Sequence, residues 1–350
     1  MATAAQRRIK SVSYAKYGYI FTAPFFIVYF IFMLFPLLTT FKLSVYGNGL
    51  SDKLDAAGTS INCFVGMDNF KTILAGGTDY KSMGIHENFV KFFGNTIIIW
   101  VGNFIPQICL SLLLAVWFTD LRVKMPGKGF FKVVMYMPNI ITAASVAGLF
   151  LSLCGDSKYS VLNSFLVSHG FLDEAYMFAS NKWSSRIIVM FIQVWMWFGN
   201  TMIMLMSGIQ GINESLFEAA EIDGANSRQT FWRITFPLLK SIMVYTLLTS
   251  MIGGLQMFDI PFMFHTGTVI NSHLETIAIF IYEYFHRDYL HPSYGYSAAA
   301  SVILFVITSI LGALVFYVQR DKDAIEIQKK RRAAAKEAKR KAARGGGFSI

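Results

Sequence analysis

Glu218-Ala219-Ala220-Glu221-Ile222-Asp223-Gly224-Ala225, with Ile234-Thr235-Phe236-Pro237-Leu238-Leu239 shortly after it, is a polar, helix-favouring stretch in an otherwise apolar chain. It belongs to a segment, residues 210–240, that lies between apolar runs at residues 187–209 and 242–264. Each run is long enough for a membrane helix, which needs about 20 mainly apolar residues. The pattern therefore predicts two membrane helices joined by a helical loop that lies along the membrane face.

The composition is that of an integral membrane protein. Hydrophobic residues make up 54% of the 350 residues and charged residues only 15%, and the mean hydropathy is +0.47. A soluble domain carries about a quarter charged residues. The net charge of +10 comes from basic loops and a basic tail, so it does not indicate nucleic-acid binding.

Six apolar runs reach the length of a membrane helix: residues 19–41, 92–118, 133–153, 187–209, 242–264 and 298–318. We therefore predict an all-α, polytopic membrane protein with six transmembrane helices. Residues 1–17 would form a basic N-terminus, residues 18–320 the transmembrane domain, and residues 321–350 a basic tail.

Lys and Arg residues give the orientation, because short cytoplasmic loops carry an excess of them. Most of the 31 lie in the N-terminus, in the loops around residues 122–132 and 228–240, and in the tail from residue 320 onward. We therefore expect both termini and the 210–240 segment on the cytoplasmic side. The tail either lies on anionic lipid or is solvated.

The 210–240 segment has the end signals of two short helices. Asn213 is a plausible cap for the first helix, and Asp223-Gly224 is the turn that ends it, since glycine adopts a left-handed conformation without penalty. Asn226 or Ser227 can cap the second helix. Pro237 marks the entry to the fifth span.

The same segment resembles the EAA motif of permease subunits of bacterial ABC importers, in which Glu-Ala-Ala is followed by Gly and then by Ile-x-x-Pro. In that family this loop is the contact with the ATPase. The resemblance implies that the ATPase-coupling residues here are Glu218, Ala219, Ala220, Asp223, Gly224 and Pro237. Phe236 stands where the family usually has Leu, which conserves the apolar character.

Further motifs are similar to those of the maltose and multiple-sugar permease class: Phe64-Val65-Gly66-Met67-Asp68-Asn69-Phe70, Met137-Pro138-Asn139 and Trp195-Met196-Trp197. The resemblance covers about residues 18–320. It implies a bacterial cytoplasmic-membrane complex with a second, homologous permease, two ATP-binding subunits and an extracellular solute-binding protein or lipoprotein. ATP and Mg would bind the partner ATPase, and this chain would bind no cofactor.

Polar groups inside the spans are candidates for solute contact, because such groups are costly in a membrane and often functional. They are Asn103, Gln107, Asn139, Gln193, Asn200, Gln256 and Asp259, with Trp195 and Trp197 nearby. The resemblance to the maltose importer carries solute-contact positions onto Asn139, Gln193, Met196, Trp197, Asn200, Ser250 and Gly254. The alternative is that these groups hydrogen-bond between helices. For Asp259, a pairing with the partner permease and a place in an outer water-filled gate also stay open.

Other functions are weaker alternatives. A membrane-embedded enzyme could use the external histidines or Asp259, but the sequence has no HExxH or comparable metal spacing. We therefore expect neither catalytic residues nor a metal site. A permease for glycerol phosphate or a peptide is a closer alternative to a sugar or oligosaccharide permease. No Lys or Arg lies well inside a span, which disfavours a phosphorylated solute.

Overall fold

The computed structural model describes residues 15–47, 63–77, 80–120, 126–267, 273–286 and 294–319. The predicted basic tail and most of the basic N-terminus lie outside these described residues. The described chain divides into two compact units, residues 1–95 with 275–305 and residues 96–274 with 306–350.

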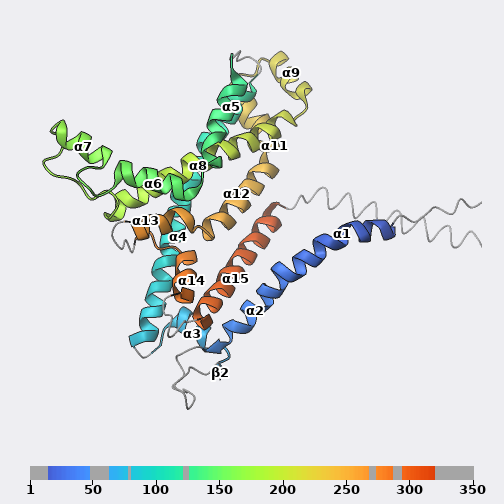
Figure 1. Ribbon diagram of the computed structural model, residues 1–350. Helices are drawn as coiled ribbons and strands as arrows, with labels where there is room; N and C mark the ends of the chain where they lie inside the picture. The colour runs from blue at the N-terminus through green and yellow to red at the C-terminus, as the bar shows by residue number, and fades with distance from the viewer. Residues whose placement is uncertain are drawn as a thin grey trace, which may run out of the picture. The chain divides into compact units, whose positions relative to one another are not determined.

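The first unit holds the N-terminal helix and a minimal hairpin. Its elements are α1 (Ala15–Tyr29), the π-helical turn η1 (Phe30–Leu34), α2 (Phe35–Ser44), β1 (Tyr46–Gly47), β2 (Cys63–Phe64), α3 (Asp68–Ala75), the start of α4 (Tyr80–Thr119), α14 (Ile277–His286) and the first half of α15 (Tyr294–Gln319) (Figure 1). Strands β1 and β2 pair antiparallel, with Tyr46 opposite Phe64. The sequence did not predict this hairpin.

The hairpin explains the motif that runs from Phe64 to Phe70. Gly66 has a φ of +59°, which favours glycine because other residues carry a steric penalty there. The buried Asn69 side chain donates to the carbonyl oxygens of Ser44 (2.9 Å) and Tyr46 (3.0 Å). Asn69 therefore ties α3 to the end of α2.

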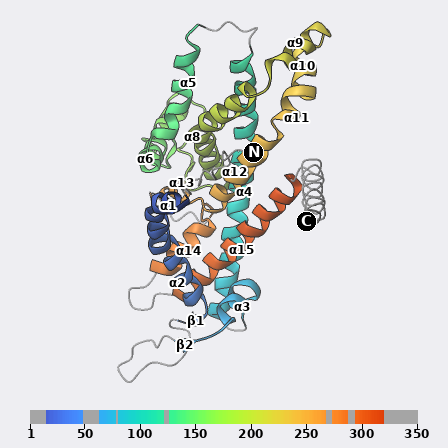
Figure 2. The ribbon, with the colours of Figure 1, turned by 90° about the vertical axis from the view of Figure 1, so that its right-hand side faces the viewer.

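The second unit contains most of the spans and the 210–240 segment. Besides the rest of α4 and α15 it holds α5 (Lys128–Tyr136), the 3₁₀ turn η2 (Met137–Ile140), α6 (Ala143–Cys154), α7 (Val161–Ser168), α8 (Lys182–Gln210), α9 (Glu214–Ile222), α10 (Ser227–Thr230), the π-helical turn η3 (Phe231–Thr235), α11 (Phe236–Leu238), α12 (Lys240–Leu255) and α13 (Asp259–Gly267). Figure 2 shows α9 to α11 following the end of α8.

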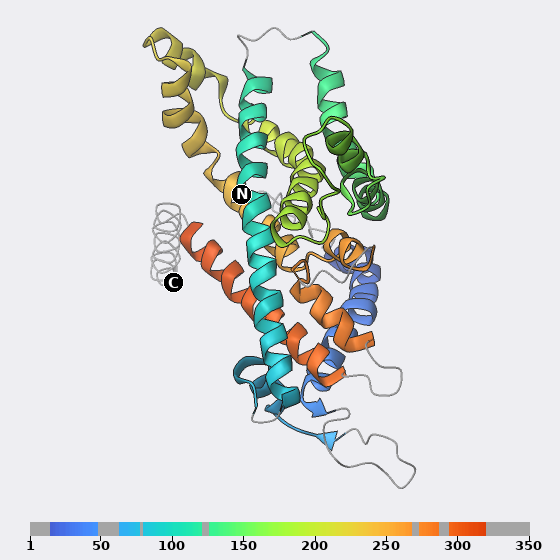
Figure 3. The same ribbon diagram turned by 90° about the vertical axis from the view of Figure 1, so that its left-hand side faces the viewer.

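Within the described ranges, five helices are long and apolar enough to cross a membrane, and a sixth span results if a bent pair is counted as one. This confirms the prediction of a helical, polytopic membrane protein. Helix α4 is longer than the predicted span 92–118. Its 40 residues reach about 60 Å, or twice the thickness of the hydrocarbon core. Figure 3 shows it as one continuous helix.

The predicted third span, 133–153, is not one helix. Residues 128–140 and 143–154 are bent by 92° at the break between them. Pro138 lacks a backbone N–H and lies in the 3₁₀ turn η2. Thr142 then takes an extended conformation and caps α6 through its side chain. The proline and the cap together end one helix and start the next.

Two other prolines follow widened helical turns. Pro36 is the second residue after η1, where the Phe35 N–H donates to the Phe30 carbonyl. Pro237 is likewise the second residue after η3, where the Phe236 N–H donates to the Phe231 carbonyl. Because proline cannot donate to the carbonyl one turn earlier, the regular ladder is interrupted there. The π-helical turns carry each helix across the interruption.

Two apolar clusters form the core of the second unit. One joins Ile99, Val146, Ala147, Val189, Ile192, Met196, Met257, Ile260, Phe264 and Leu274, and the other joins Leu114, Ala115, Phe118, Met202, Leu205, Met206, Ile209 and Leu239. Helices α4 and α8 each contribute to both clusters. These two helices therefore connect the two parts of the core.

Gly199 is where α5 approaches the backbone of α8. A Cβ on Gly199 would overlap the carbonyl oxygen of Met135 and lie 2.9 Å from the Cα of Tyr136. These are backbone atoms, which cannot move aside as a flexible side chain can. The close crossing therefore requires glycine at this position.

We predict that Gly199→Ala lowers the free energy of unfolding by about 1–3 kcal/mol, the usual cost of overpacking. The measurement is thermal unfolding of the detergent-purified protein. Gly148→Ala is the matched control, because a Cβ there meets no atom within 4 Å and should change stability little. Equal stability of both variants would contradict the close crossing.

Candidate functional site

Helix α9, which carries Glu218-Ala219-Ala220, is capped at both ends by hydrogen bonds within the chain. At its start the Asn213 side chain accepts a hydrogen bond from the Ser215 N–H at 3.1 Å, as predicted. At its end the Ala225 N–H donates to the Ala220 carbonyl and the Gly224 N–H to the Glu221 carbonyl, which is a Schellman motif. Gly224 has a φ of +73°, in agreement with the predicted turn.

A second short helix follows with its own cap. The Asn226 side chain accepts from the Gln229 N–H, and the Gln229 side chain accepts from the Asn226 N–H, both at 2.9 Å. This capping box satisfies two backbone donors at once. Of the two predicted cap candidates, the structure uses Asn226. Pro237 then lies in α11, just before α12 begins at Lys240.

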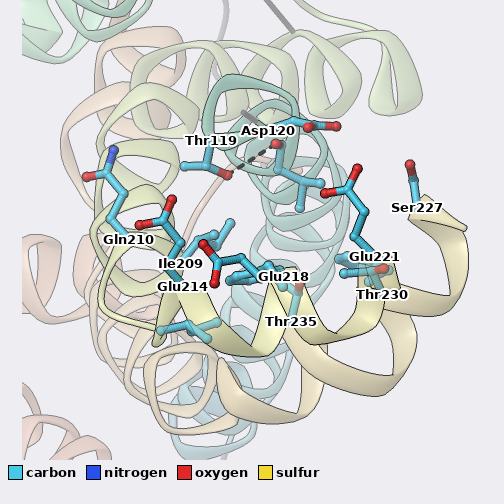
Figure 4. Close-up of a pocket in the computed structure, with 14 residues that line it drawn as sticks. Thr119, Asp120, Ile209, Gln210, Glu214, Glu218, Glu221, Ser227, Thr230 and Thr235 are labelled. Carbon is cyan, nitrogen blue, oxygen red and sulfur yellow. Dashed lines mark hydrogen bonds between the residues drawn. The ribbon is translucent and has the colours of Figure 1, made fainter. Parts of the chain in front are cut away.

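One side of α9 faces a pocket of ≈ 330 Å³. The pocket is lined by the ends of α4 and α8, by α9 and by the α10–η3 segment, and its acidic lining residues are Asp120, Glu214, Glu218 and Glu221. Figure 4 shows the three glutamates extending from α9 on the side where Thr119 lies. Among the described residues that line it there is no Lys or Arg. The pocket therefore suits a cationic group.

The opposite side of α9 is open. At 100° per residue, Leu216, Ala219 and Asp223 lie away from the pocket, and all three are exposed. Ile222, beside them, is 86% exposed. Because Ala219 is small and flanked by exposed apolar side chains, a partner surface can approach it closely. Ala220 is half-buried.

Several polar residues of the spans bond between or within helices. Gln107 donates to the Thr201 hydroxyl at 2.8 Å, linking α4 to α8, and Asn103 donates to the Ile99 carbonyl of its own helix at 2.8 Å. Trp195 packs against the first apolar cluster, with its ring centroid 5.9 Å from that of Phe150. These side chains have structural partners in this conformation.

Gln193 differs from them. Its side chain is 8% exposed, and across the described ranges no hydrogen bond reaches its amide. A buried amide without a partner costs about 1–3 kcal/mol. Such a group is a natural contact for a polar ligand or a water molecule.

The remaining candidates are accessible in this chain. Trp197 and Asn200 are exposed on α8, one turn apart, and Asn139 is half-buried in η2. Gln256 is exposed at the end of α12, and Asp259 is exposed in the first turn of α13, where the helix dipole favours a carboxylate. Asp259 is therefore not deep inside a continuous helix.

Ser250 and Gly254 lie against a residue that sequence reasoning missed. The Trp100 indole Nε1 donates to the Ser250 hydroxyl at 3.2 Å, and the indole ring lies next to Gly254. The sequence signal was a single tryptophan within an apolar run. Nothing local to residue 100 could have indicated a partner 150 residues away.

The comparison with known proteins identifies the family. Residues 95–323 match the model of the binding-protein-dependent transport system inner membrane component. The chain belongs to this family. It is thus a multi-pass membrane subunit of a transport system that depends on a binding protein, and it is not an enzyme.

Named relatives match over nearly the whole chain. The lactose transport system permease protein LacF of Rhizobium radiobacter is 28% identical over 92% of this chain and 100% of its own length. The arabinooligosaccharides transport system permease protein AraP of Bacillus subtilis (strain 168) is 28% identical over 89% of this chain and 92% of its own length.

A solved structure has the same fold. In the bacterial alginate ABC transporter in complex with an alginate pentasaccharide-bound periplasmic protein, one chain aligns with a TM-score of 0.70 and 22% identity. The alignment covers 90% of this chain and 98% of that one.

We predict that Gln107 and Thr201 are energetically coupled by about 0.6 kcal/mol, the average for interhelical hydrogen bonds in membranes, and by no more than about 1.7 kcal/mol. The measurement is a double-mutant cycle of Gln107→Leu and Thr201→Val on the free energy of unfolding. Thr246→Val, whose hydroxyl donates within its own helix, should show no coupling to Gln107→Leu. Zero coupling for both pairs would contradict the bond.

Proposed function

We propose that this chain is the permease subunit of an ATP-driven importer that moves a sugar or oligosaccharide across the cytoplasmic membrane. The observation that carries the proposal is the structure of α9, a helix that is capped at both ends. Leu216 and Ala219 are exposed on one side of it, and Glu218 lines an acidic pocket on the other. A helix of this kind suits a docking element that transmits a push without changing its own structure.

The partners follow from this role. We infer that an ATP-binding subunit contacts α9 and that a second, homologous permease completes the transport path, with two ATP-binding subunits in the complex. The N-terminal span, residues 16–44, has no buried residue in the window that defines it, which is consistent with a helix whose neighbours are lipid or another subunit. ATP and Mg would be bound by the ATPase.

Orientation follows from the basic residues. With the N-terminus, the 210–240 segment and the tail cytoplasmic, α9 faces the compartment that holds ATP. The binding protein then delivers solute from outside. This arrangement requires the membrane to be the bacterial cytoplasmic membrane.

The solute class follows from the polar groups that are free to act. Gln193, Trp197 and Asn200 combine amides with an aromatic ring on α8, and amides suit hydroxyl groups while an aromatic ring suits the apolar face of a sugar. The lactose and arabinooligosaccharide permeases named above support a carbohydrate. Since no Lys or Arg lies in residues 187–209 or 241–264, a phosphorylated solute would have no counter-charge there.

We predict that Gly224→Arg lowers uptake at least ~10-fold and weakens co-purification of the ATP-binding subunit, because it distorts the turn that ends α9. Solute binding to the binding protein should be unchanged. Gly170→Arg is the matched control, since Gly170 has nearly the same φ (+72°) and open surroundings but lies outside α9. It should retain the ATP-binding subunit. Normal uptake by Gly224→Arg would refute the coupling role.

We also predict that Asn200→Leu lowers uptake about 10-fold without changing co-purification of the ATP-binding subunit, since it removes a solute hydrogen bond worth about 1.5 kcal/mol. The measurement is uptake of labelled sugar by the reconstituted complex with its binding protein. Ser207→Ala on the same helix is the control, because Ser207 donates to its own helix at Ile203. A loss equal in both variants would exclude a specific role for Asn200.

A further inference from the structure

The pocket beside α9 is separate from the exposed side of that helix. It lies between α9 and the ends of α4 and α8, whereas Leu216 and Ala219 are exposed on the opposite side. Its wall is mainly apolar, with Val116, Ile209 and Phe231 among the lining residues, and the four acidic residues described above also line it. A partner that binds the exposed side therefore leaves this pocket open to a second group.

A buried hydroxyl group lines the same pocket. Thr235, in η3, is 5% exposed, and within the part of the chain that the structure describes its hydroxyl has no hydrogen-bond partner. Figure 4 shows its side chain among those that line the pocket. The hydroxyls of Thr119 and Thr230, by contrast, donate to the carbonyls of Ala115 (2.7 Å) and Asn226 (3.1 Å). Because buried polar groups in proteins are normally paired, Thr235 indicates that a polar group from elsewhere enters the pocket.

The size and charge of the pocket define the kind of group that fits. A cube of the pocket's ≈ 330 Å³ has an edge of about 7 Å, which is less than the ~10–12 Å diameter of a helix with its side chains. Side chains therefore fit where a whole helix does not. Lys and Arg have an apolar stem and a charged head that carries only hydrogen-bond donors. They match an apolar wall, a set of carboxylates and a hydroxyl that is free to accept.

The C-terminal tail is the richest source of such side chains in this chain. Of the 16 residues 329–344, nine are Lys or Arg, six are Ala and one is Glu337. The small alanines add no bulk that would keep the basic side chains away from a wall. Two basic residues of the 210–240 segment, Arg228 and Arg233, are exposed and do not line the pocket.

The loop after α4 is a second basic stretch that is near the pocket in sequence. It contributes Arg122 and Lys124, directly after the lining residue Asp120. Two cations leave half of the four acidic residues without a counter-charge. The tail therefore complements the pocket better than this loop does.

The order of the spans predicts the membrane face at which the tail emerges. The ends of α4 and α8 both line the pocket, so these two spans end at the same face. From there α12 crosses away and α15 crosses back, which brings Gln319 to the face that carries the pocket. Residues 320–329 reach up to ~35 Å when extended, about the diameter of a small domain. The tail thus starts on the correct face and is long enough to reach.

We propose that the basic segment 329–344 of this chain docks on the pocket beside α9. Its Lys or Arg side chains would lie between the carboxylates, and one head group would donate to the Thr235 hydroxyl. The segment would occupy the pocket side of α9 and leave Leu216 and Ala219 uncovered for another subunit. This contact lies within the chain and does not depend on which solute is carried.

The test is disulfide formation within the full chain. The chain is purified in a neutral detergent and also placed in phosphatidylcholine vesicles with or without ~30% phosphatidylglycerol, an anionic lipid. The reporting pair is Gln210→Cys, at the pocket, with Ala335→Cys in the tail; the control pair is Ile222→Cys, on the open side of α9, with Ala335→Cys. Alanine replaces the native cysteines Cys63, Cys109 and Cys154.

The pocket variant combines Asp120→Asn, Glu214→Gln and Glu221→Gln and keeps Glu218. Its matched control is Asp173→Asn with Glu174→Gln, which removes two exposed carboxylates outside the pocket. The thermal stability of each variant in detergent reports on folding.

We expect the reporting pair to cross-link at least about fivefold faster than the control pair in detergent and in both kinds of vesicle. The pocket variant should lower this rate about fivefold or more, and raising the salt from ~0.05 M to ~0.5 M should lower it as well, because salt screens exposed charges. Asp173→Asn with Glu174→Gln should leave the rate unchanged. Thr235→Val should lower it about twofold at unchanged stability, because a buried hydrogen bond is lost.

Several results would overturn the docking. Equal rates for the reporting and control pairs, or a rate that the pocket variant does not change, would show that the carboxylates do not hold the tail. Loss of the cross-link only in vesicles with anionic lipid would assign the tail to the lipid surface. A cross-link that forms only after Arg122→Gln with Lys124→Gln would assign the pocket to the loop after α4. An unchanged rate in Thr235→Val would show that no side chain enters the pocket. None of these results affects the proposed transport function, since no uptake is measured.

Discussion

The constraint on which the rest of the structure depends is that no backbone polar group is left unpaired in lipid. A continuous helix meets it by pairing its N–H and carbonyl groups within itself, as α4 does over most of its 40 residues, with one interruption at Pro106. Each proline in a span breaks this pairing once. The chain responds with a π-helical turn before Pro36 and Pro237 and with a 3₁₀ turn and a sharp bend at Pro138. Much of the local irregularity of the spans is thus a response to three residues.

The same constraint separates the polar side chains into two groups. Those that hold helices together, such as Gln107 with Thr201, have a partner within the bundle. Gln193 is buried and has no hydrogen-bond partner among the described residues, and Asn200 is exposed. Side chains in this second group are available to a solute, to water or to another subunit. The division between structural and functional polar residues is therefore set by position on the helix and not by residue type.

Local features of the structure were predictable from the sequence, and long-range ones were not. The cap at Asn213 and the turn at Gly224 depend on neighbouring residues, and the structure has both. The bend at Pro138 was foreseeable as a kink but not as a 92° break, because its size depends on the Thr142 cap and on packing. The hairpin of Tyr46 with Phe64 and the bond of Trp100 with Ser250 join distant residues. Their partners carry no mutual signal in a single sequence.

The capped ends of α9 affect how reversibly this helix can bind a partner. Asn213 satisfies one donor at the start of the helix, and the Schellman bonds at Gly224 satisfy carbonyls at its end. The ends of the helix therefore need no hydrogen bonds from a partner's backbone. Separating the two surfaces then breaks no backbone hydrogen bond at these ends. A contact of this kind can break and re-form many times with little structural penalty. Binding and release at this contact can then be fast, because the helix does not need to refold in each transport cycle.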